Sequence, residues 1–441
     1  MKVFLDLVGC RLNQAEIENY ARQFRAAGHS LTADPGEADL VVINTCAVTK
    51  AAAADSRKKI RGAARAGAKE IEVTGCWSTL NPEVAARLPS VRQVIRNADK
   101  DRLVPLALGL PGETFDLEPV ERLPIPGARL RTRAFIKVQD GCDNRCTFCV
   151  TTLARGRGRS RPIREILGDI HAAFHAGETS SDGMGSGGAK EIVLTGVHLG
   201  SWGQDFSTPL HLSQLIAAIL KYTDVPRLRL SSLEPWDLDE EFFSLWDNPR
   251  LCRHLHLPLQ SGCGTTLRRM ARKTTPESFA ALVAAARQAV PAIAITTDVI
   301  AGFPGETAAE FRESLAFVRE MNFAGGHVFT YSSRPGTAAA RMLGQIPHPL
   351  RKERNAQLRA SLAESARRYR QCFLGQTLEV LWEGATALGP KTWHLSGLTD
   401  NYLRVRAEAP RDMWNEITPV RLTDLREDGL QGEMCLAESN S

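Results

Sequence analysis

The sequence predicts an α/β protein with three domains: an N-terminal parallel-sheet α/β domain, a central partial (β/α)6 barrel and a small C-terminal β-barrel. The first 100 residues alternate apolar, strand-like runs with helical stretches, which is typical of a parallel sheet. In the middle of the chain, six further strand-like runs are separated by helical patterns, as in barrel folds. After about residue 374, strand-like runs alternate with Gly and Pro. A length of 441 residues suits three domains of roughly 150 residues each.

The composition is that of an ordinary folded protein. Hydrophobic residues make up 43% and charged residues 24% of the chain, which excludes wholesale disorder and a fibrous protein. No uncharged apolar run reaches the length of a membrane span, and Asp6 interrupts the N-terminal apolar residues before a signal peptide could form. We therefore expect no membrane association and a cytoplasmic location. The net charge of +5 is compatible with an RNA partner but also with an ordinary solvated surface.

Three cysteines each come at the end of a strand-like run in the first domain. The runs 3–8, 40–45 and 71–74 are expected strands, 14–27 and 51–67 are expected helices, and Cys10, Cys46 and Cys76 follow the runs. The carboxyl ends of parallel strands meet at one edge of a sheet, so the three thiols can converge there. The alternative is three separately buried free cysteines, which are common in protein cores.

The rest of the chain is expected to follow a linker, a barrel and a closing module. Residues 105–128 contain five prolines and little periodicity, which indicates an extended linker. Residues 178–188 are rich in Gly and Ser and indicate a flexible insertion. The expected barrel strands are 134–138, 191–195, 227–231, 254–257, 293–299 and 326–330, followed by a basic helix at 351–373 and strands at 377–381, 398–408 and 417–425.

A second set of cysteines has the spacing Cys-x3-Cys-x2-Cys, at Cys142, Cys146 and Cys149. A structural zinc site takes four ligands, and no fourth Cys or His follows at a suitable spacing. Three thiolates on one short loop suit an iron-sulfur cubane in which one iron is left open for a substrate ligand. Zinc binding remains the alternative.

This loop, with Phe148 just before its last cysteine, resembles that of the radical S-adenosylmethionine superfamily. The resemblance implies that Cys142, Cys146 and Cys149 ligate a [4Fe-4S] cluster. It also implies that the amino and carboxylate groups of S-adenosylmethionine chelate the open iron, and that one electron then yields a 5'-deoxyadenosyl radical. A one-electron donor such as a flavodoxin or ferredoxin is implied as well.

Further motifs resemble the methylthiotransferases of that superfamily. These are Gly-Cys-Arg-Leu-Asn-Gln at 9–14, Asn-Thr-Cys at 44–46 and Thr-Gly-Cys at 74–76. They imply a second, auxiliary [4Fe-4S] cluster on Cys10, Cys46 and Cys76, and two molecules of S-adenosylmethionine per turnover. Residues 397–405 resemble the TRAM domain, an RNA-binding module. The implied domains are 1–104 for the methylthiotransferase domain, 105–128 for the linker, 129–373 for the radical core with its trailing helix, and 374–438 for the TRAM domain.

Residues 9–16 and 194–201 are most similar to the branch that acts on N6-threonylcarbamoyladenosine next to the tRNA anticodon. That branch methylthiolates C2 of this nucleoside at position 37, as a transferase of sulfur-containing groups. The branch that acts on isopentenyladenosine usually has Gln-Asn in place of Val197-His198, and it is one alternative. Another branch modifies a ribosomal protein aspartate, which a segment after residue 374 with six basic and eleven acidic residues would favour. A non-catalytic iron-sulfur protein that binds RNA or acts as a sensor is the remaining alternative.

Other residues are expected to bind S-adenosylmethionine or RNA, whereas the sequence identifies no catalytic residue beyond the cluster ligands. The turn at 302–305 lets the backbone approach a ligand closely. The family resemblance implies that this turn lies beside the adenosyl group, so Gly302 and Gly305 are expected to contact S-adenosylmethionine, with Ser232 and Glu234 as similar strand-end candidates. Guanidinium groups after the cysteine loop and in the last segment suit contacts to RNA phosphates. These expected RNA-binding residues are Arg155, Arg157, Arg159, Arg161, Arg404 and Arg406.

Overall fold

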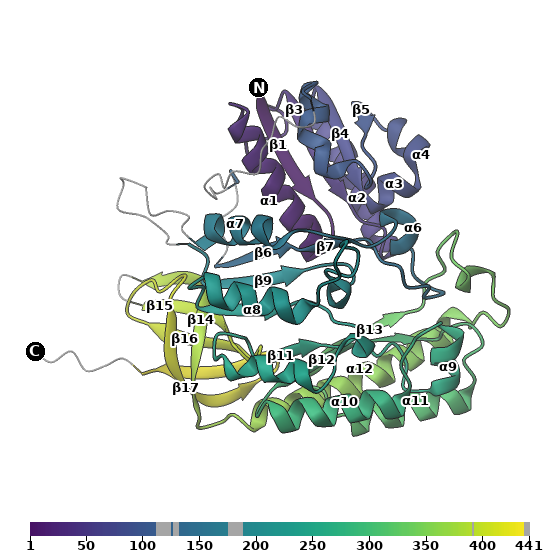
Figure 1. Cartoon of the computed structure of the whole chain (residues 1–441), viewed down its shortest axis with the longest axis vertical. Helices are drawn as coiled ribbons and strands as arrows, with labels where there is room; N and C mark the ends of the chain where they lie inside the picture. Colours follow the sequence, from purple (N-terminus) through teal and green to yellow (C-terminus); the bar gives the residue numbers. More distant parts are fainter. Residues whose placement is uncertain (112–124, 127–131, 175–187, 390–391, 436–441) are drawn as a thin grey trace, which may run out of the picture. The chain divides into compact units, whose positions relative to one another are not determined.

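The chain divides into two compact units, and Figure 1 labels their helices and strands. The computed structural model describes residues 1–111, 125–126, 132–174, 188–389 and 392–435. Nearly all of the expected insertion at 178–188, and most of the expected linker, lie outside these residues. The first unit comprises Met1–Gly188, Leu194–Leu212 and Arg334–Thr337, and the second comprises Ala189–Val193, Ser213–Ser333 and Ala338–Ser441.

The first unit begins with a parallel five-stranded sheet in the order β2-β1-β3-β4-β5. This confirms the predicted parallel-sheet α/β domain. The strands are β1 (Lys2–Leu7), β2 (Ser30–Leu31), β3 (Leu40–Thr45), β4 (Glu70–Gly75) and β5 (Val91–Val94). The helices are α1 (Arg11–Ala26), α2 (Lys50–Arg65), α3 (Cys76–Leu80), α4 (Pro82–Ala86) and α5 (Leu103–Leu108), with a 3-10 turn at Lys100–Arg102.

Burial explains why these segments take their conformations. All six residues of β3 are buried, as expected of a strand in the middle of a sheet covered on both faces. Helix α1 packs Ile17, Tyr20 and Phe24 into the core, and their spacing of three to four residues places them on one helical face. Helix α2 begins where the Thr49 side chain accepts a hydrogen bond from the backbone N–H of Ala52 at 3.0 Å.

The first unit continues with the segment that carries the second set of cysteines. Its elements are β6 (Arg133–Lys137), β7 (Gln139–Asp140), α6 (Thr151–Arg155), β8 (Arg159–Ser160) and α7 (Ile163–Phe174). Strands β7 and β8 pair in antiparallel fashion on either side of the cysteine loop and close its ends. Strand β9 (Glu191–Thr195) begins in the second unit and ends in the first, where a 3-10 turn at Leu199–Ser201 follows it.

The second unit contains parallel strands and the helices between them. The sheet β11-β12-β13 is parallel, and parallel bridges join Leu228 to Leu251 and Ser232 to His256 beside β10 and β11. Strand β10 in turn neighbours β9. The elements are α8 (Leu212–Tyr222), β10 (Arg227–Leu230), β11 (His254–His256), α9 (Gly264–Arg269), α10 (Pro276–Ala289), β12 (Ala294–Ala301), α11 (Ala308–Glu320), β13 (Gly325–Thr330) and α12 (His348–Gln371), with 3-10 turns at Pro235–Asp237, Glu241–Asp247 and Ala339–Arg341.

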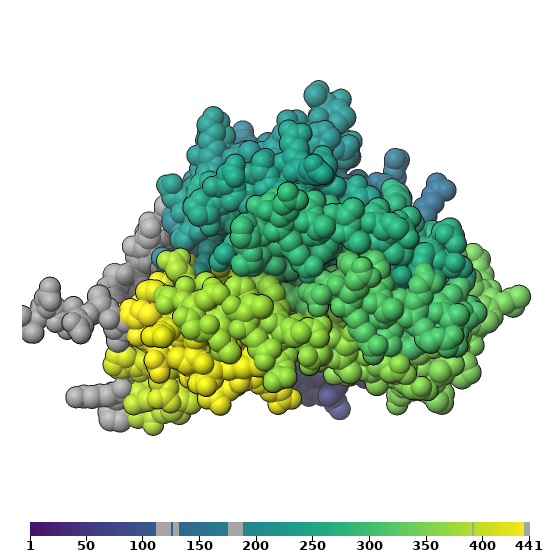
Figure 2. All heavy atoms as spheres, turned by 90° about the horizontal axis from the view of Figure 1, so that it is seen from below, coloured from purple at the N-terminus to yellow at the C-terminus, as the bar shows by residue number. Residues whose placement is uncertain are grey.

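The second unit ends in a closed five-stranded barrel in the order β14-β15-β16-β18-β17. Its strands are β14 (Thr377–Gly389), β15 (Thr392–Thr399), β16 (Arg404–Ala409), β17 (Ile417–Arg426) and β18 (Gly429–Met434). Trp382, Val405 and Leu422 fill its interior. The barrel, yellow-green to yellow in Figure 2, lies against other residues of its unit, because the Arg227 guanidinium donates to the Leu398 carbonyl at 2.9 Å and Arg253 pairs with Asp400 at 2.6 Å.

Two sequence-based boundaries were wrong. The run 398–408 forms two strands, β15 and β16, because Asp400–Leu403 turns the chain there, with Tyr402 at φ 65°. Residues 105–108 of the expected linker belong to α5, whose Pro105 lies in the first helical turn, where no backbone N–H is needed. The short elements β5, α3, α4 and β18 had not been expected. No helix among the described residues is both long enough and apolar enough to cross a bilayer.

Candidate functional site

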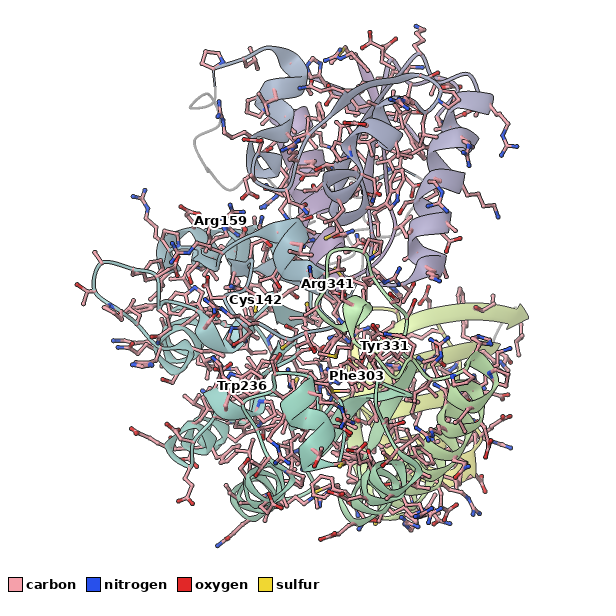
Figure 3. The ribbon with its side chains drawn as sticks, turned by 90° about the vertical axis from the view of Figure 1, so that its right-hand side faces the viewer. Cys142, Arg159, Trp236, Phe303, Tyr331 and Arg341 are labelled. Carbon is pink, nitrogen blue, oxygen red and sulfur yellow. The ribbon has the colours of Figure 1, made fainter. Side chains whose placement is uncertain are left out.

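Cys142, Cys146 and Cys149 lie on one loop between β7 and α6 of the first unit, and all three are partly buried (Cys142 is labelled in Figure 3). Backbone groups of the same loop approach two of the sulfurs. The N–H of Asn144 donates to Cys142 Sγ and the N–H of Thr151 donates to Cys149 Sγ, each at 3.4 Å. Hydrogen bonds to sulfur of this kind are typical of thiolates that ligate iron-sulfur clusters.

The buried side chain of Gln139 holds this loop to the loop that follows β9. Its Nε2 donates to the Gly141 carbonyl at 2.8 Å, and its Oε1 accepts from the backbone N–H groups of Val197 and His198 at 3.0 and 2.9 Å. Asn144 also contacts the His198 ring, at 3.3 Å. Sequence reasoning missed Gln139, although an amide just before a cysteine loop is a detectable signal.

Cys10, Cys46 and Cys76 follow β1, β3 and β4 and are neighbours at one edge of the sheet, as their strand-end positions predicted. Gly9 has φ 116°, and a Cβ at this position would lie 2.8 Å from Cys46 Sγ, so only glycine allows the Cys10 loop to approach this closely. Burial, and to a smaller extent the sulfurs of Cys10 and Cys76, raise the pKa of the Cys46 thiol to about 11. Cys10 is exposed, whereas Cys46 and Cys76 are buried.

Arg155, at the end of α6, is 4% exposed, and its guanidinium is surrounded by partners in the first unit. Its Nε donates to Cys76 Sγ at 3.3 Å, and its Nη1 donates to Glu16 Oε1 at 3.1 Å and Asp140 Oδ1 at 2.9 Å. The expectation that Arg155 contacts RNA was therefore wrong, because a buried and fully engaged guanidinium cannot reach a phosphate.

Four further charged groups complete this buried cluster, which we call the Arg155 network: Glu16, Lys100, Lys137 and Asp140. Lys100 is fully buried; it pairs with Glu16, and with Asp140 at 2.7 Å. Burial alone would raise the pKa of Glu16, but Lys100 and Arg155 hold that pKa down at about 2. Burial likewise opposes ionisation of Asp140, yet Arg155 and Lys100 lower the pKa of this carboxyl. Both carboxyls are therefore ionised at neutral pH.

The donor sets suit iron-sulfur clusters, in which the thiolates bind different irons of one cluster. Each set supplies three thiols, with N–H donors directed at the sulfurs of Cys142, Cys149 and Cys76.

The other expected RNA-binding arginines differ in how exposed their guanidinium groups are and in whether these groups are already paired with a carboxylate. Arg157, Arg159, Arg404 and Arg406 are exposed, and the Arg157 side chain retains 94% of its accessible surface (Arg159 is labelled in Figure 3). Arg161 is largely engaged, because it pairs with Asp169 at 2.7 Å and with Glu165 at 3.3 Å. Arg406 pairs with Asp428 at 2.7 Å, half exposed to solvent.

The residues expected to bind S-adenosylmethionine all lie in the second unit. Gly302 and Gly305 have φ values of 72° and 76°, so the tight turn was predicted correctly. The space beside Gly302 is taken by the Arg351 side chain, which a Cβ would meet at 2.3 Å. Phe303, labelled in Figure 3, packs edge-on against Tyr331. Ser232 is exposed, and Glu234 pairs with Arg272 at 2.6 Å.

Two family models match the chain. Residues 2–96 match the model described as "Uncharacterized protein family UPF0004", and residues 136–318 match the Radical SAM superfamily. The second match contains the Cys142 loop and most of the strands from β6 to β12.

The chain is similar over nearly its whole length to curated tRNA-modifying proteins. It is 35% identical to a Bacillus subtilis protein named threonylcarbamoyladenosine tRNA methylthiotransferase MtaB, over 94% of this chain and 92% of the relative. The protein of the same name from Thermotoga maritima is 36% identical over 97% and 96%. A tRNA-2-methylthio-N(6)-dimethylallyladenosine synthase from Alkaliphilus oremlandii is 30% identical over 98% and 92%.

Solved structures share the fold at low sequence identity. The radical S-adenosylmethionine methyltransferase TsrM from Kitasatospora setae has a TM-score of 0.56 and 16% identity, covering 77% of this chain and 75% of that one. The cobalamin-dependent S-adenosylmethionine radical enzyme OxsB has a TM-score of 0.50 and 13% identity, covering 77% and 54%. These likenesses concern the arrangement of helices and strands.

Proposed function

The chain belongs to the radical S-adenosylmethionine methylthiotransferase family, and on that premise we propose that it methylthiolates C2 of N6-threonylcarbamoyladenosine at position 37 of tRNA. The observation that carries the proposal is the near full-length identity of 35–36% to two threonylcarbamoyladenosine tRNA methylthiotransferases. The dimethylallyladenosine synthases among its relatives are 29–31% identical. The reaction belongs to the transferases of sulfur-containing groups.

The two cysteine sets have separate roles in this proposal. Cys142, Cys146 and Cys149 would hold the radical [4Fe-4S] cluster, and Cys10, Cys46 and Cys76 would hold the auxiliary one. When bound, the two clusters and two molecules of S-adenosylmethionine supply an electron, a methyl group and a sulfur site. These are what the replacement of an unreactive C–H bond requires. The protein itself keeps the first loop in place through Gln139 and the backbone N–H groups of Asn144 and Thr151.

The domain organisation of the family gives each part of the chain a task. In this proposal, residues 1–104 are the methylthiotransferase domain and residues 129–373 the radical core, with the linker 105–128 between them. The radical core is proposed to have the partial (β/α)6 barrel of that superfamily. Residues 374–438 are a TRAM domain for RNA, and their closed barrel supports this assignment. The enzyme acts in the cytoplasm with a one-electron donor such as a flavodoxin or ferredoxin.

Individual contacts follow from the exposed or strand-end positions of the residues. Gly302, Gly305, Ser232 and Glu234 are the proposed contacts to S-adenosylmethionine. Arg157, Arg159, Arg404 and Arg406 are proposed to meet the tRNA backbone, since exposed guanidinium groups suit phosphates. Arg161 has less freedom to do so, because Asp169 and Glu165 already bind its guanidinium.

The test is mass spectrometry of tRNA nucleosides from a host stripped of its own methylthiotransferases. With this gene, we expect the methylthio derivative of threonylcarbamoyladenosine to appear. The isopentenyl product instead would assign the chain to the other tRNA branch. If neither product forms in cells that contain cluster-loaded protein, the tRNA function is wrong, and the aspartate of a ribosomal protein or a non-catalytic role comes next.

Two cysteine variants test the proposed roles. Cys146→Ala should abolish cleavage of S-adenosylmethionine to 5'-deoxyadenosine, since the radical loop loses one of its three thiolates. Cys46→Ala should retain some cleavage and lose the methylthio product. Cys372→Ala, an exposed cysteine after α12, is the matched control and should retain both. Cleavage by the first variant, or full product from the second, would contradict the assigned roles.

A further inference from the structure

Arg155 is the side chain through which the two cysteine sets of the first unit are joined. It comes six residues after Cys149 in the sequence, yet its Nε donates to Cys76 Sγ at 3.3 Å. Its Nη2 donates at 2.9 Å to Asn13 Oδ1, and the same oxygen lies 3.7 Å from Cys10 Sγ. One guanidinium therefore contacts one N-terminal cysteine directly and a second through an amide.

The same guanidinium also holds the start of the radical loop. Its Nη1 donates to Asp140 Oδ1 at 2.9 Å, and this oxygen accepts the backbone N–H of Gly141, the residue before Cys142, at 2.8 Å. The backbone N–H of Cys142 donates to the Gly156 carbonyl, directly after Arg155, at 3.0 Å. Both sets of cysteines thus depend on the position of one residue.

The surroundings keep the guanidinium charged and immobile. Its side chain is 2% exposed, and Glu16 and Asp140 are its ionic partners. Lys100 pairs with the same two carboxylates, so two cations face two anions in this part of the network. Asn97 supplies a second, longer N–H contact to Cys76 Sγ, at 3.7 Å, and also donates to the Ala154 carbonyl at 2.9 Å.

We propose that Arg155 is a positioning residue that sets the reduction potential of the auxiliary cluster through its N–H bond to the Cys76 sulfur. The inference rests on the proposed function, because it takes Cys76 to be a ligand of that cluster. Hydrogen bonds to the sulfurs and the local net charge are the main protein influences on the potential of such clusters. A cation beside the sulfur stabilises the more negative, reduced cluster, so Arg155 raises the potential.

The Arg155 network makes predictions of opposite sign for two of its members. Arg155→Met removes a cation and an N–H donor, and should lower the potential of the auxiliary cluster. Glu16→Gln leaves Arg155 in place, removes an anion that partly neutralises it, and should raise the potential. Loosened packing alone does not predict opposite shifts from two neighbouring substitutions.

The experiment uses the full chain with Cys142, Cys146 and Cys149 all changed to Ala, so that only the auxiliary cluster is present. The cluster is reconstituted, its iron and sulfide are measured, and its reduction is followed by electron paramagnetic resonance at set potentials. In this background, Arg155→Met should lower the ratio of reduced to oxidised cluster about tenfold at a given potential, equivalent to about 59 mV. Arg61→Met, which removes an exposed cation from α2, is the matched control and should cause no shift.

Each outcome decides a separate point. The role of Arg155 is overturned if the loaded cluster of Arg155→Met has the same potential as the parent. It is also overturned if Glu16→Gln shifts the potential in the same direction as Arg155→Met. If Arg155→Met takes up no iron, Arg155→Lys and Glu16→Gln decide instead. Arg155→Lys keeps the charge and should have a potential near that of the parent, whereas the potential of Glu16→Gln should be higher than the parent's. If the parent itself takes up no iron, the assignment of Cys10, Cys46 and Cys76, and with it the proposed function, is contradicted.

Discussion

At the scale of single residues, burial decides what the charged side chains of the first unit do. Arg155 and Arg157 are two positions apart, but the first is enclosed by Cys76, Glu16 and Asp140, whereas the second has 94% of its side-chain surface exposed. A buried charge must be paired and hydrogen-bonded to be tolerated. Arg155 is therefore available to the cysteines and Arg157 to external ligands.

Glu72, on β4, gives a prediction for the dependence of stability on pH. The residue is fully buried; its Oε1 accepts from Arg92 at 2.9 Å, and its Oε2 has no hydrogen-bond partner among the described residues. Burial raises the pKa of Glu72 from 4.5 to about 7, even though Arg92 opposes the shift. Between these values the folded protein keeps a proton that the unfolded chain releases, so stability falls as the pH rises through this window.

We expect Glu72→Gln to be more stable than the parent at pH 8, by about 1–3 kcal/mol, and close to it at pH 4.5. Glutamine keeps the shape and the hydrogen bond but has no proton to lose. The measurement is the thermal midpoint of the full chain between pH 4.5 and 8. The control is Glu83→Gln, at an exposed site on α4, which should leave the thermal midpoint unchanged at pH 4.5 and at pH 8. An equal gain at both pH values would refute the assigned titration.

At the scale of elements, local hydrogen bonds determine where two helices of the second unit begin. Thr275 and Ser278 form a capping box at α10, and Thr307 and Glu310 form one at α11. In the second box, the Thr307 side chain accepts the Glu310 N–H at 3.2 Å, and Glu310 accepts the Thr307 N–H at 2.8 Å. Glu310 also pairs with Arg269 of α9, so the helix start is connected to a neighbouring helix.

Thr307→Ala should lower the free energy of unfolding of the protein by about 1 kcal/mol, because the N–H of Glu310 loses its capping oxygen. Urea unfolding followed by circular dichroism measures the loss. Thr307→Ser keeps the oxygen and should recover most of the stability. Thr208→Ala, in an exposed loop of the first unit, serves as the control for removal of a threonine away from a cap. A loss of the same size in Thr208→Ala would argue against the capping box as the cause.

At the scale of the whole molecule, charge is unevenly distributed along the chain. The net charge is +5, yet the segment from residue 375 onward has six basic and eleven acidic residues. Two ion pairs on the barrel surface, Arg406 with Asp428 and Arg411 with Glu416, already neutralise part of the basic charge. Affinity for a polyanion therefore depends on particular exposed arginines rather than on net charge.

For tRNA binding we expect Arg404→Gln to weaken affinity and to reduce the slope of log K against log salt by about 1. Arg406→Gln should have a smaller effect, since Asp428 already holds that guanidinium. Arg411→Gln, whose partner is Glu416, is the control. Binding of unmodified tRNA to the full chain at several salt concentrations measures these slopes. Equal effects of all three substitutions would show that the ion pairs do not determine which arginines meet RNA.

Much of the architecture could be read before the structure, because periodicity and strand-end position are local properties. The strands β1, β3, β4, β9 and β12 and the helices α1, α2 and α12 lie within a few residues of their expected positions. The expected convergence of Cys10, Cys46 and Cys76 also follows from a general property of parallel sheets. Short elements such as β5 and β18 have too few residues to show a period.

The sequence by itself determined the α/β class, the two cysteine sets and the resemblance to a family, since each depends on residues close together in the chain or on motif spacing. Only the tertiary structure decided that Arg155 is buried beside Cys76 and that Gln139 holds the loop of Cys142, Cys146 and Cys149. The partners of Arg155 include Glu16, 139 positions away, and no local pattern reports such a contact. Whether a charged side chain faces water or a sulfur depends on which distant elements pack around it.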